Sequence, residues 1–281
     1  MGTTMELVIL GSAGGPQPHP GKAAPATAVV VDGDIHVIDC GNGVGRQIVS
    51  AGLELTDLRS VLVTHHHVDH NADLGALVHL AWTAARCEPV DVYGPAPLES
   101  MIKQYLELNE PDIGHRESLG RPALAGVFRP HEVSGPGTVH EADGVRISAA
   151  VATHPPMPSF SYRVDTHGRS VVVSGDTARC DEVVELSRGA GVLVHEAYSP
   201  DHLAEFMAGS NTKIERLRQH FARAHTSAED AGRVAAEAGV RTLVLWHLIP
   251  WQLSDEEYAA QAARTFDGEI VVAHDLQRIP V

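Results

Sequence analysis

The chain has 281 residues, enough for one large α/β domain or two small ones, and its 43% hydrophobic and 20% charged residues are ordinary for a soluble protein. Its formal net charge of -15 argues against a protein built to grip a phosphate backbone. Three widely spaced cysteines without C-x-x-C spacing support neither a disulfide framework nor a zinc finger. We expect a cytoplasmic protein, since we see neither a signal-peptide pattern nor an apolar stretch long enough for a membrane span.

The first half of the chain predicts strands that alternate with helices. Apolar stretches between turn formers predict strands at 6–10, 27–31, 35–38, 60–63 and 91–93. Helices are expected at 44–51, 72–86 and 98–108. Between 109 and 137 proline and glycine recur and the pattern breaks. Long irregular segments are often lids, so we interpret 109–137 as either a cap over the functional site or a surface excursion.

The second half repeats the order of strands first and alternating elements later. Strands are expected at 145–151, 160–164, 170–173, 192–195, 242–246 and 270–273, and helices at 200–209, 227–238 and 255–266. This order predicts two similar halves, and no linker separates them. We therefore predict a single domain over residues 1–281.

The most informative motif is the run His65-His66-His67-Val68-Asp69-His70, directly after the predicted strand at 60–63. Strand ends are where α/β proteins usually place their chemistry. Imidazole nitrogen and carboxylate oxygen suit zinc and neighbouring first-row metals. Chance clustering among 18 histidines would not explain the preceding strand or the acidic residue at this spacing. The pattern H-x-H-x-D-H predicts two metals, one at His65 and His67 and the other at Asp69 and His70.

Three distant residues are candidates for the remaining ligands. His154, Asp176 and His247 each follow a predicted strand, and a rigid sheet can hold widely separated residues in register. The two carboxylate oxygens of Asp176 could bridge the metals. A bridging water would then fill the open positions, with its pKa lowered towards neutrality.

These motifs resemble those of the metallo-β-lactamase-fold hydrolases over nearly the whole chain. The similarity is greatest to the branch that holds tRNase Z, the arylsulfatase-type enzymes and small phosphodiesterases. The matching motifs, in order, are Leu10 to Pro16, Ile38 to Gly41, the H-x-H-x-D-H run, His154, Ser174 to Thr177, and His247.

The resemblance implies a four-layer αββα sandwich of two mixed β-sheets. It also implies that His65, His67 and His154 hold one metal, that Asp69, His70 and His247 hold the other, and that Asp176 bridges them. His66 and Val68 then fill variable positions. We expect two divalent ions, Zn²⁺ first, with Mn²⁺ or Fe able to use the same ligands.

Two further motifs resemble the tRNase Z-like branch: His195-Glu196-Ala197 and His225-Thr226-Ser227. The branch implies that Glu196 and His225 form a pair that protonates the leaving group, a task for which a carboxylate-held histidine is suited. The alternative is that His225 merely precedes a helix capped by Thr226 or Ser227. The catalytic residues we assign are Asp69, Glu196 and His225.

The substrate prediction departs from tRNase Z. That enzyme carries a long arm between the motifs equivalent to His154 and Asp176, whereas here the intervening residues allow only a turn and two strands. Together with the negative charge, this predicts a small-molecule ester as partner, without tRNA and without a membrane. Met157, Phe160 and Trp251 are expected to form an apolar wall beside the ester. Relatives in the branch suggest a homodimer by analogy only.

The predicted function is a dinuclear metal-dependent hydrolase, with a metal-activated hydroxide attacking a phosphodiester or a sulfate ester. A lactonase or thioesterase is the alternative within the same class, and β-lactam hydrolysis is disfavoured by the tRNase Z-like motifs. A non-catalytic metal-binding protein is the alternative from another class, which the loss of one or more ligands would indicate.

Overall fold

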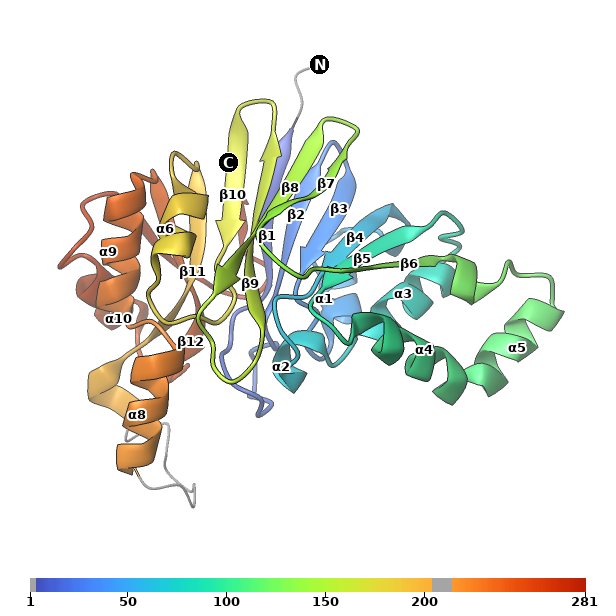
Figure 1. Ribbon diagram of the computed structural model, residues 1–281, viewed down its shortest axis with the longest axis horizontal. Coiled ribbons are helices and arrows are strands. Elements are labelled where there is room, and N and C mark those ends of the chain that lie inside the picture. Colours follow the sequence, from blue (N-terminus) through green and yellow to red (C-terminus); the bar gives the residue numbers. More distant parts are fainter. Residues whose placement is uncertain (1–3, 204–213) are drawn as a thin grey trace.

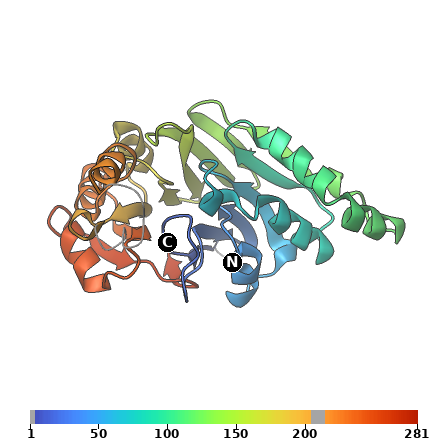
Figure 2. The same cartoon turned by 90° about the horizontal axis from the view of Figure 1, so that it is seen from below.

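Two seven-stranded β-sheets lie face to face with helices on both outer sides (Figure 1). The computed structural model describes residues 4–203 and 214–281. Figure 2 looks along the sandwich from below, with one group of helices beside each sheet. The predicted αββα sandwich is confirmed.

The first sheet has the strand order β14-β1-β2-β3-β4-β5-β6. Its strands are β1 (Met5–Gly11), β2 (Ala26–Val31), β3 (Asp34–Ile38), β4 (Leu58–Leu62), β5 (Val90–Gly94), β6 (Phe128–Glu132) and β14 (Arg278–Pro280). Pairing is antiparallel from β14 to β3 and parallel from β3 to β6. The sheet is therefore mixed, as predicted.

The second sheet repeats this plan with the order β13-β12-β11-β10-β9-β8-β7. Its strands are β7 (Gly137–Ala142), β8 (Val145–Ala152), β9 (Ser159–Thr166), β10 (Arg169–Val173), β11 (Val192–Tyr198), β12 (Thr242–Ile249) and β13 (Glu269–Val272). Pairing is antiparallel from β7 to β10 and parallel from β10 to β13. The two halves thus share one architecture, in agreement with the repeated order in the sequence.

The strands are apolar on both faces because each sheet is covered twice. In β1, Leu7 and Ile9 pack into the core between the sheets, whereas Val8 and Leu10 pack under the outer helices. Alternate side chains of a strand point to opposite faces, so one continuous apolar run fills both layers.

Helices in the described ranges cover the outer face of each sheet. The first sheet packs against α1 (Val44–Ser50), α3 (Leu74–Thr83) and α4 (Leu98–Leu108), and the second against α6 (Asp181–Ser187), α9 (Ala228–Ala238) and α10 (Asp255–Ala262). The structure further describes α2 (Val68–Asn71), α5 (Glu110–Ser118), whose Ile113 joins the layer on the first sheet, α8 (Ile214–Ala224) and the 3-10 turns η1 (Leu55–Asp57), η2 (Leu124–Gly126) and η3 (Pro200–His202). No helix in the described part of the chain is long and apolar enough to cross a membrane.

Two element predictions differ from the structure. The segment 109–137 is not irregular, because it contains α5, η2 and β6. Pro111 occupies the first turn of α5, where a proline is tolerated because the first backbone N–H groups of a helix have no partner within it. The helix expected at 200–209 begins as η3, and its remainder from residue 204 lies outside the described residues.

The loops that follow the metal motifs lie at one edge of the sandwich. In Figure 1, α2 and α8 both lie at the lower edge, α8 below the second sheet and α2 nearer the first. This edge carries the functional site.

Candidate metal centre and active site

Three imidazole nitrogens converge at the first cluster. His67 Nδ1 lies 2.9 Å from His65 Nε2 and 3.2 Å from His154 Nε2. His65 and His67 come from the loop after β4, whereas His154 follows β8 on the other sheet. The structure thus brings together the three residues predicted for one metal.

The second cluster contains the other predicted ligands. Asp69 Oδ2 lies 3.7 Å from His70 Nε2 and 3.5 Å from His247 Nε2. Asp176 stands between the clusters: its Oδ1 is 3.4 Å from His70 Nε2, and its Oδ2 is 3.9 Å from His65 Nε2. One carboxylate therefore faces both groups of histidines, as a bridging ligand must.

Outer hydrogen bonds orient two of these histidines. His70 Nδ1 is 2.7 Å from Asp39 Oδ2, and His154 Nδ1 is 2.8 Å from the Ala224 carbonyl oxygen. Because each Nδ1–H is used in this way, each Nε2 keeps its lone pair for the site. Asp39 also accepts hydrogen bonds from the backbone N–H and hydroxyl of Thr64, so it fixes the start of the motif loop.

His247 reaches the site through a β-bulge. Glu196 pairs with Trp246 and Ala197 pairs with Leu248, which leaves His247 as the extra residue of β12. Its φ of 52° lies in the left-handed region, which non-glycine residues seldom adopt. The bulge re-aims a strand residue that would otherwise follow the alternation of β12. The sequence predicted His247 after a strand, whereas it lies within one.

The charges of the cluster fit a cation. Burial is the main cause that lowers the pKa of His65, His67 and His154, so these imidazoles are neutral and can act as ligands. Burial would raise the pKa of Asp176, but nearby histidines, His247 and His70 first, hold it well below its usual value. The first cluster with Asp176 therefore offers neutral nitrogen and ionised oxygen, which a divalent metal requires. At His70 burial lowers the pKa, but Asp176 and Asp39 outweigh it and raise the pKa well above its usual value, so a cation there would have to displace a proton.

Unpaired polar atoms also point to an ion. His70 Nε2 and Asp176 Oδ1 are buried and have no hydrogen-bond partner among the described residues. Buried polar groups are normally satisfied, so orphaned atoms that face one another need a further ligand. Together with the converging nitrogens, they show that these residues fit metal ions.

The two residues predicted to act as an acid-base pair lie within hydrogen-bond distance of each other. His225 Nδ1 lies 2.8 Å from Glu196 Oε2, and the other carboxylate oxygen of Glu196 accepts the backbone N–H of Thr177. The ring of Phe221 stacks on His225 with centroids 4.7 Å apart. His225 Nδ1 is 3.8 Å from Asp176 Oδ2, so the pair adjoins the metal ligands.

Burial favours the neutral form of both partners. It is the main cause that raises the pKa of Glu196 and the main cause that lowers the pKa of His225. A protonated Glu196 beside a neutral His225 holds as many protons as an ionised Glu196 beside an imidazolium. The two forms differ only in the position of one proton along the hydrogen bond between Glu196 and His225.

The helix cap proposed as the alternative role of this region coexists with the pair. Ser227 is the N-cap of α9, since its hydroxyl accepts the backbone N–H of Asp230. His225 lies two residues earlier and is free to face Glu196. The two interpretations therefore do not compete.

A cavity of about 400 Å³ opens onto His225 and onto four of the predicted ligands, namely His67, Asp69, Asp176 and His247. Its apolar lining comes from Pro16, Val68, Leu217, Phe221 and Ile249. None of its described lining residues belongs to 109–137, and α8 forms one wall instead.

The apolar wall expected from Met157, Phe160 and Trp251 was wrong. Phe160 is buried in the core between the sheets, and Trp251 packs against His19 with ring centroids 5.0 Å apart. None of the three is among the residues that line the cavity. Strand alternation sends Phe160 inward, a detail that proximity in sequence to His154 did not reveal.

Two residues near the site were not singled out by the sequence. Asp39 lies in a motif that the sequence does flag, but its hydrogen bond to His70 depends on the packing of β3 beside β4. His220 lines the cavity from α8, where nothing in the local pattern distinguishes it from a surface histidine. His66, by contrast, turns away and lies 2.7 Å from the Pro95 carbonyl oxygen, in keeping with a variable position.

Comparison with known proteins agrees with this arrangement. The family described as "Beta-lactamase superfamily domain" matches residues 36–248. A protein named Ribonuclease Z from Mycobacterium marinum is 35% identical over 287 aligned residues, covering 99% of each chain. The Ribonuclease Z of Mycobacterium avium is 35% identical over 99% of this chain and 98% of its own.

Solved structures show the same fold at lower identity. Human tRNase Z, short form, superposes with a TM-score of 0.74 at 20% identity, over 99% of both chains. The metallo-beta-lactamase fold protein YhfI from Bacillus subtilis gives a TM-score of 0.73 at 21% identity, over 99% of this chain and 100% of its own.

These matches overturn the prediction of a small-molecule partner without tRNA. The missing arm was the main argument, yet the M. marinum Ribonuclease Z aligns over 99% of both chains and so has no long insertion relative to this one. The net charge was the second argument, but it is a sum over the molecule, whereas recognition depends on the local field. With its fold, its ligand clusters and these relatives, the chain belongs to the beta-lactamase superfamily, as a metal-dependent hydrolase of the metallo-β-lactamase fold related to ribonuclease Z.

Proposed function

We propose that this protein is a ribonuclease that hydrolyses a phosphodiester bond in tRNA. The observation that carries the proposal is the end-to-end similarity to proteins named Ribonuclease Z. The geometry supports it, because one cavity is lined both by His225, which can deliver a proton, and by four of the seven candidate ligands: His67, Asp69, Asp176 and His247. The narrower choice of phosphodiester over sulfate or acyl ester rests on that similarity.

The proposed roles follow from the positions of the side chains. His65, His67 and His154 would hold one metal, Asp69, His70 and His247 the other, and Asp176 would bridge them. Zn²⁺ is our first choice, because neutral imidazole and carboxylate are the ligands it takes in catalytic sites. Bound there, the ions would polarise the phosphoryl oxygens and supply an activated nucleophile.

His225 would complete the reaction on the leaving side. Its Nδ1 is held by Glu196, and its Nε2 has no hydrogen-bond partner among the described residues. That nitrogen can donate a proton to the departing oxygen, and Glu196 stabilises the charge that the ring carries before the transfer. Asp69 would act as a metal ligand, so its removal would abolish activity because the metal is lost.

The test is cleavage of a labelled tRNA transcript with extra 3′ nucleotides by the zinc-loaded protein. We expect cleavage that disappears in Asp69→Ala and persists in Asp267→Asn, which alters an exposed carboxylate. Intact transcript after incubation with wild-type protein that is shown to contain metal would refute the proposal. Hydrolysis of bis(p-nitrophenyl) phosphate by the same samples would then show whether the metal centre hydrolyses diesters at all.

A further inference from the structure

Helix α8 differs in charge from the rest of the chain. The whole sequence has 36 acidic and 21 basic residues. In α8, however, Arg216, Arg218 and Arg223 stand against a single acidic residue, Glu215, and all three arginines are exposed. An acidic protein therefore presents a basic helix at the edge that carries its metal ligands.

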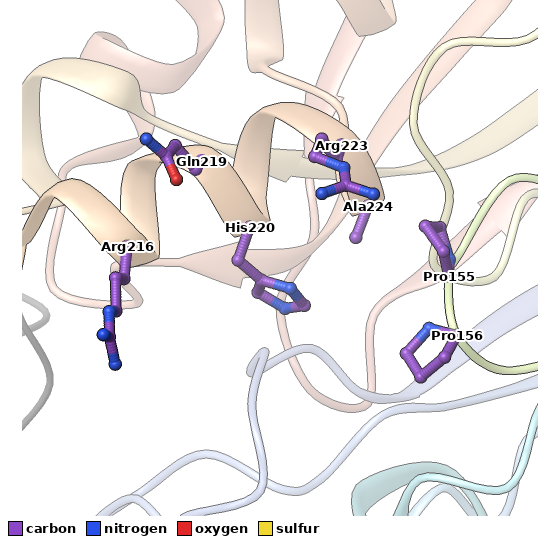
Figure 3. A pocket seen from close by; sticks show the side chains of 7 residues that line it. All are labelled: Pro155, Pro156, Arg216, Gln219, His220, Arg223 and Ala224. Carbon is purple, nitrogen blue, oxygen red and sulfur yellow. The ribbon is translucent and has the colours of Figure 1, made fainter.

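Two of the arginines share one face of the helix. Arg216, His220 and Arg223 follow one another at spacings of four and three residues, which aligns side chains along a helix. With Gln219, Ala224 and the Pro155-Pro156 turn they line a cavity of about 370 Å³, which we call the α8 groove. Figure 3 shows His220 and Arg223 extending from α8 on the side that faces the two prolines.

Within the part of the chain that the structure describes, no carboxylate neutralises the arginines of the α8 groove. Neither Arg216 nor Arg223 forms an ion pair with any residue in the ranges the structure describes. Other arginines on the same half do: Arg179 pairs with Glu237, Arg188 with Glu185 and Arg233 with Asp230. The described lining of the α8 groove contains no carboxylate.

The α8 groove adjoins the active-site cavity. His220 lines both cavities, and its ring centroid lies 5.4 Å from that of His225 and 6.5 Å from that of His154. The groove wall at Pro155 directly follows the metal ligand His154. A polymer cleaved at the metal centre would therefore pass close to a basic groove.

We propose that the α8 groove binds the phosphate backbone of the RNA substrate beside the cleaved bond, an inference that rests on the proposed ribonuclease function. Guanidinium groups hold phosphate oxygens through paired hydrogen bonds, and the Gln219 amide adds a further donor. Backbone contacts of this kind set the register of a nucleic acid without reading its sequence. On a molecule of net charge -15, an unpaired basic groove is where a polyanion is drawn.

The position of α8 also fits the path of the chain. Between His154 and Asp176 the structure has only β9 and β10, so no inserted arm is available there to hold RNA. In the sequence, α8 lies between the Glu196 and His225 motifs instead. The carbonyl oxygen of its last residue, Ala224, accepts a hydrogen bond from His154 Nδ1. One short helix thus connects the proposed RNA contact to a metal ligand.

The experiment measures binding of fluorescein-labelled tRNA to the zinc-loaded protein by anisotropy, from 50 to 200 mM KCl. The variants are Arg216→Gln/Arg223→Gln, its charge-retaining partner Arg216→Lys/Arg223→Lys, and Arg169→Gln. Arg169 is a matched control because it is exposed and without an ion pair among the described residues. It begins β10, whose turn with β9 lies at the end of the molecule opposite α8 in Figure 1.

We expect the double glutamine variant to raise Kd roughly 5- to 10-fold and to reduce the slope of log K against log salt by about 1 to 2, since each neutralised phosphate contributes about 0.7 to 0.9. The lysine variant should keep the wild-type slope, and Arg169→Gln should change Kd less than about twofold. Wild-type Kd and slope in the glutamine variant would overturn the proposal. An equal loss of slope in the lysine variant would do the same, because charge would then not be the cause.

Cleavage of the extended transcript, measured in parallel, separates this inference from the proposed function. Wild-type protein that binds tRNA through Arg216 and Arg223 without cutting the transcript would overturn the ribonuclease proposal and leave the groove as a binding site. If the wild-type protein cuts the transcript and the glutamine variant binds and cuts it equally well, only the proposed role of the α8 groove is overturned. If the wild-type protein did not bind tRNA, the proposed role of the α8 groove would be overturned directly.

Discussion

At the scale of single residues, the site depends on which ring nitrogen each histidine presents. His70, His154 and His225 each use Nδ1 for a partner outside the cavity: Asp39, a backbone carbonyl and Glu196. Their Nε2 atoms are thereby left to face the site. The sequence shows the residue types, but the hydrogen-bond partners that determine which ring nitrogen faces the site come from other strands and helices.

The Glu196–His225 pair gives a prediction that depends on the leaving group. His225→Ala should lower kcat for tRNA cleavage by about 10²- to 10³-fold, because the departing ribose oxygen needs a proton. The loss on bis(p-nitrophenyl) phosphate should be much smaller, since nitrophenolate leaves without one. Glu196→Gln should show the same selectivity in weaker form. The measurement is single-turnover kinetics on both substrates, with zinc content determined for each sample.

His115→Ala, at an exposed histidine of α5, serves as the matched control. Equal losses on the two substrates would contradict an acid role and indicate that His225 only supports the metal centre. A fall in bound zinc would lead to the same conclusion.

At the scale of elements, β12 shows how a strand can serve both packing and chemistry. Its residues are buried throughout, and Trp246 donates its indole N–H to the Gly11 carbonyl across the core. The bulge at His247 interrupts the alternation at one point and turns the imidazole toward Asp69 and Asp176. Bulges of this kind recur next to active sites because they re-aim one side chain without dissolving the strand.

The bulge predicts which substitution at position 247 keeps the fold. Asparagine tolerates a positive φ better than most residues, so His247→Asn should preserve β12 while removing one ligand. We expect bound zinc to fall from about two ions per chain to about one, with the thermal midpoint of the metal-free protein within about 2 °C of wild type. Elemental analysis and calorimetry provide the two measurements.

The exposed His274 offers the control substitution, His274→Asn. If His247→Asn retained two zinc ions per chain, His247 would not be a ligand. If its metal-free form unfolded far below the wild type, the bulge would need histidine for a reason other than metal binding.

At the scale of the whole molecule, four layers bury groups that would otherwise ionise. His36 on β3 is only 4% exposed and hydrogen-bonds Ser60 Oγ at 2.8 Å. Burial, as the largest cause, lowers the pKa of His36 to about 4 from an ordinary 6.5. Between these two pH values, His36 is protonated in the unfolded chain but stays neutral in the folded protein.

Stability should therefore fall as the pH drops from about 6.5 towards 4, and this histidine should contribute a loss of up to about 3 kcal/mol. Above pH 6.5 the contribution is fully present, because both states are then neutral. His36→Gln should reduce the slope of unfolding free energy against pH by up to about 1.4 kcal/mol per unit in that window. Urea denaturation of the zinc-loaded protein at several pH values measures it.

His115→Gln, an exposed position, should leave that slope as it is in the wild type. A wild-type slope in His36→Gln would mean that His36 takes up its proton in the folded protein. The metal ligands contribute equally to both variants, so they do not affect the comparison.

The sequence by itself predicted the two halves and the candidate ligands, because strand alternation, turn residues and the spacing of the motif H-x-H-x-D-H are local features. The four-layer sandwich was predicted through the resemblance of these motifs to a known family, with which the order of strands and helices agrees. It also predicted the Glu196–His225 pair, which the structure brings within hydrogen-bond distance.

Only the tertiary structure decided what surrounds these residues. Neither the α8 groove, the stacking of Phe221 on His225 nor the inward turn of Phe160 follows from neighbouring letters, because each depends on elements that meet across the fold. Net charge was a poor guide to the local field for the same reason: it sums over the whole chain, whereas folding places the arginines of α8 beside the candidate metal ligands. The sequence determines the residue types and their spacing, whereas packing between distant elements determines how those residues are arranged in space.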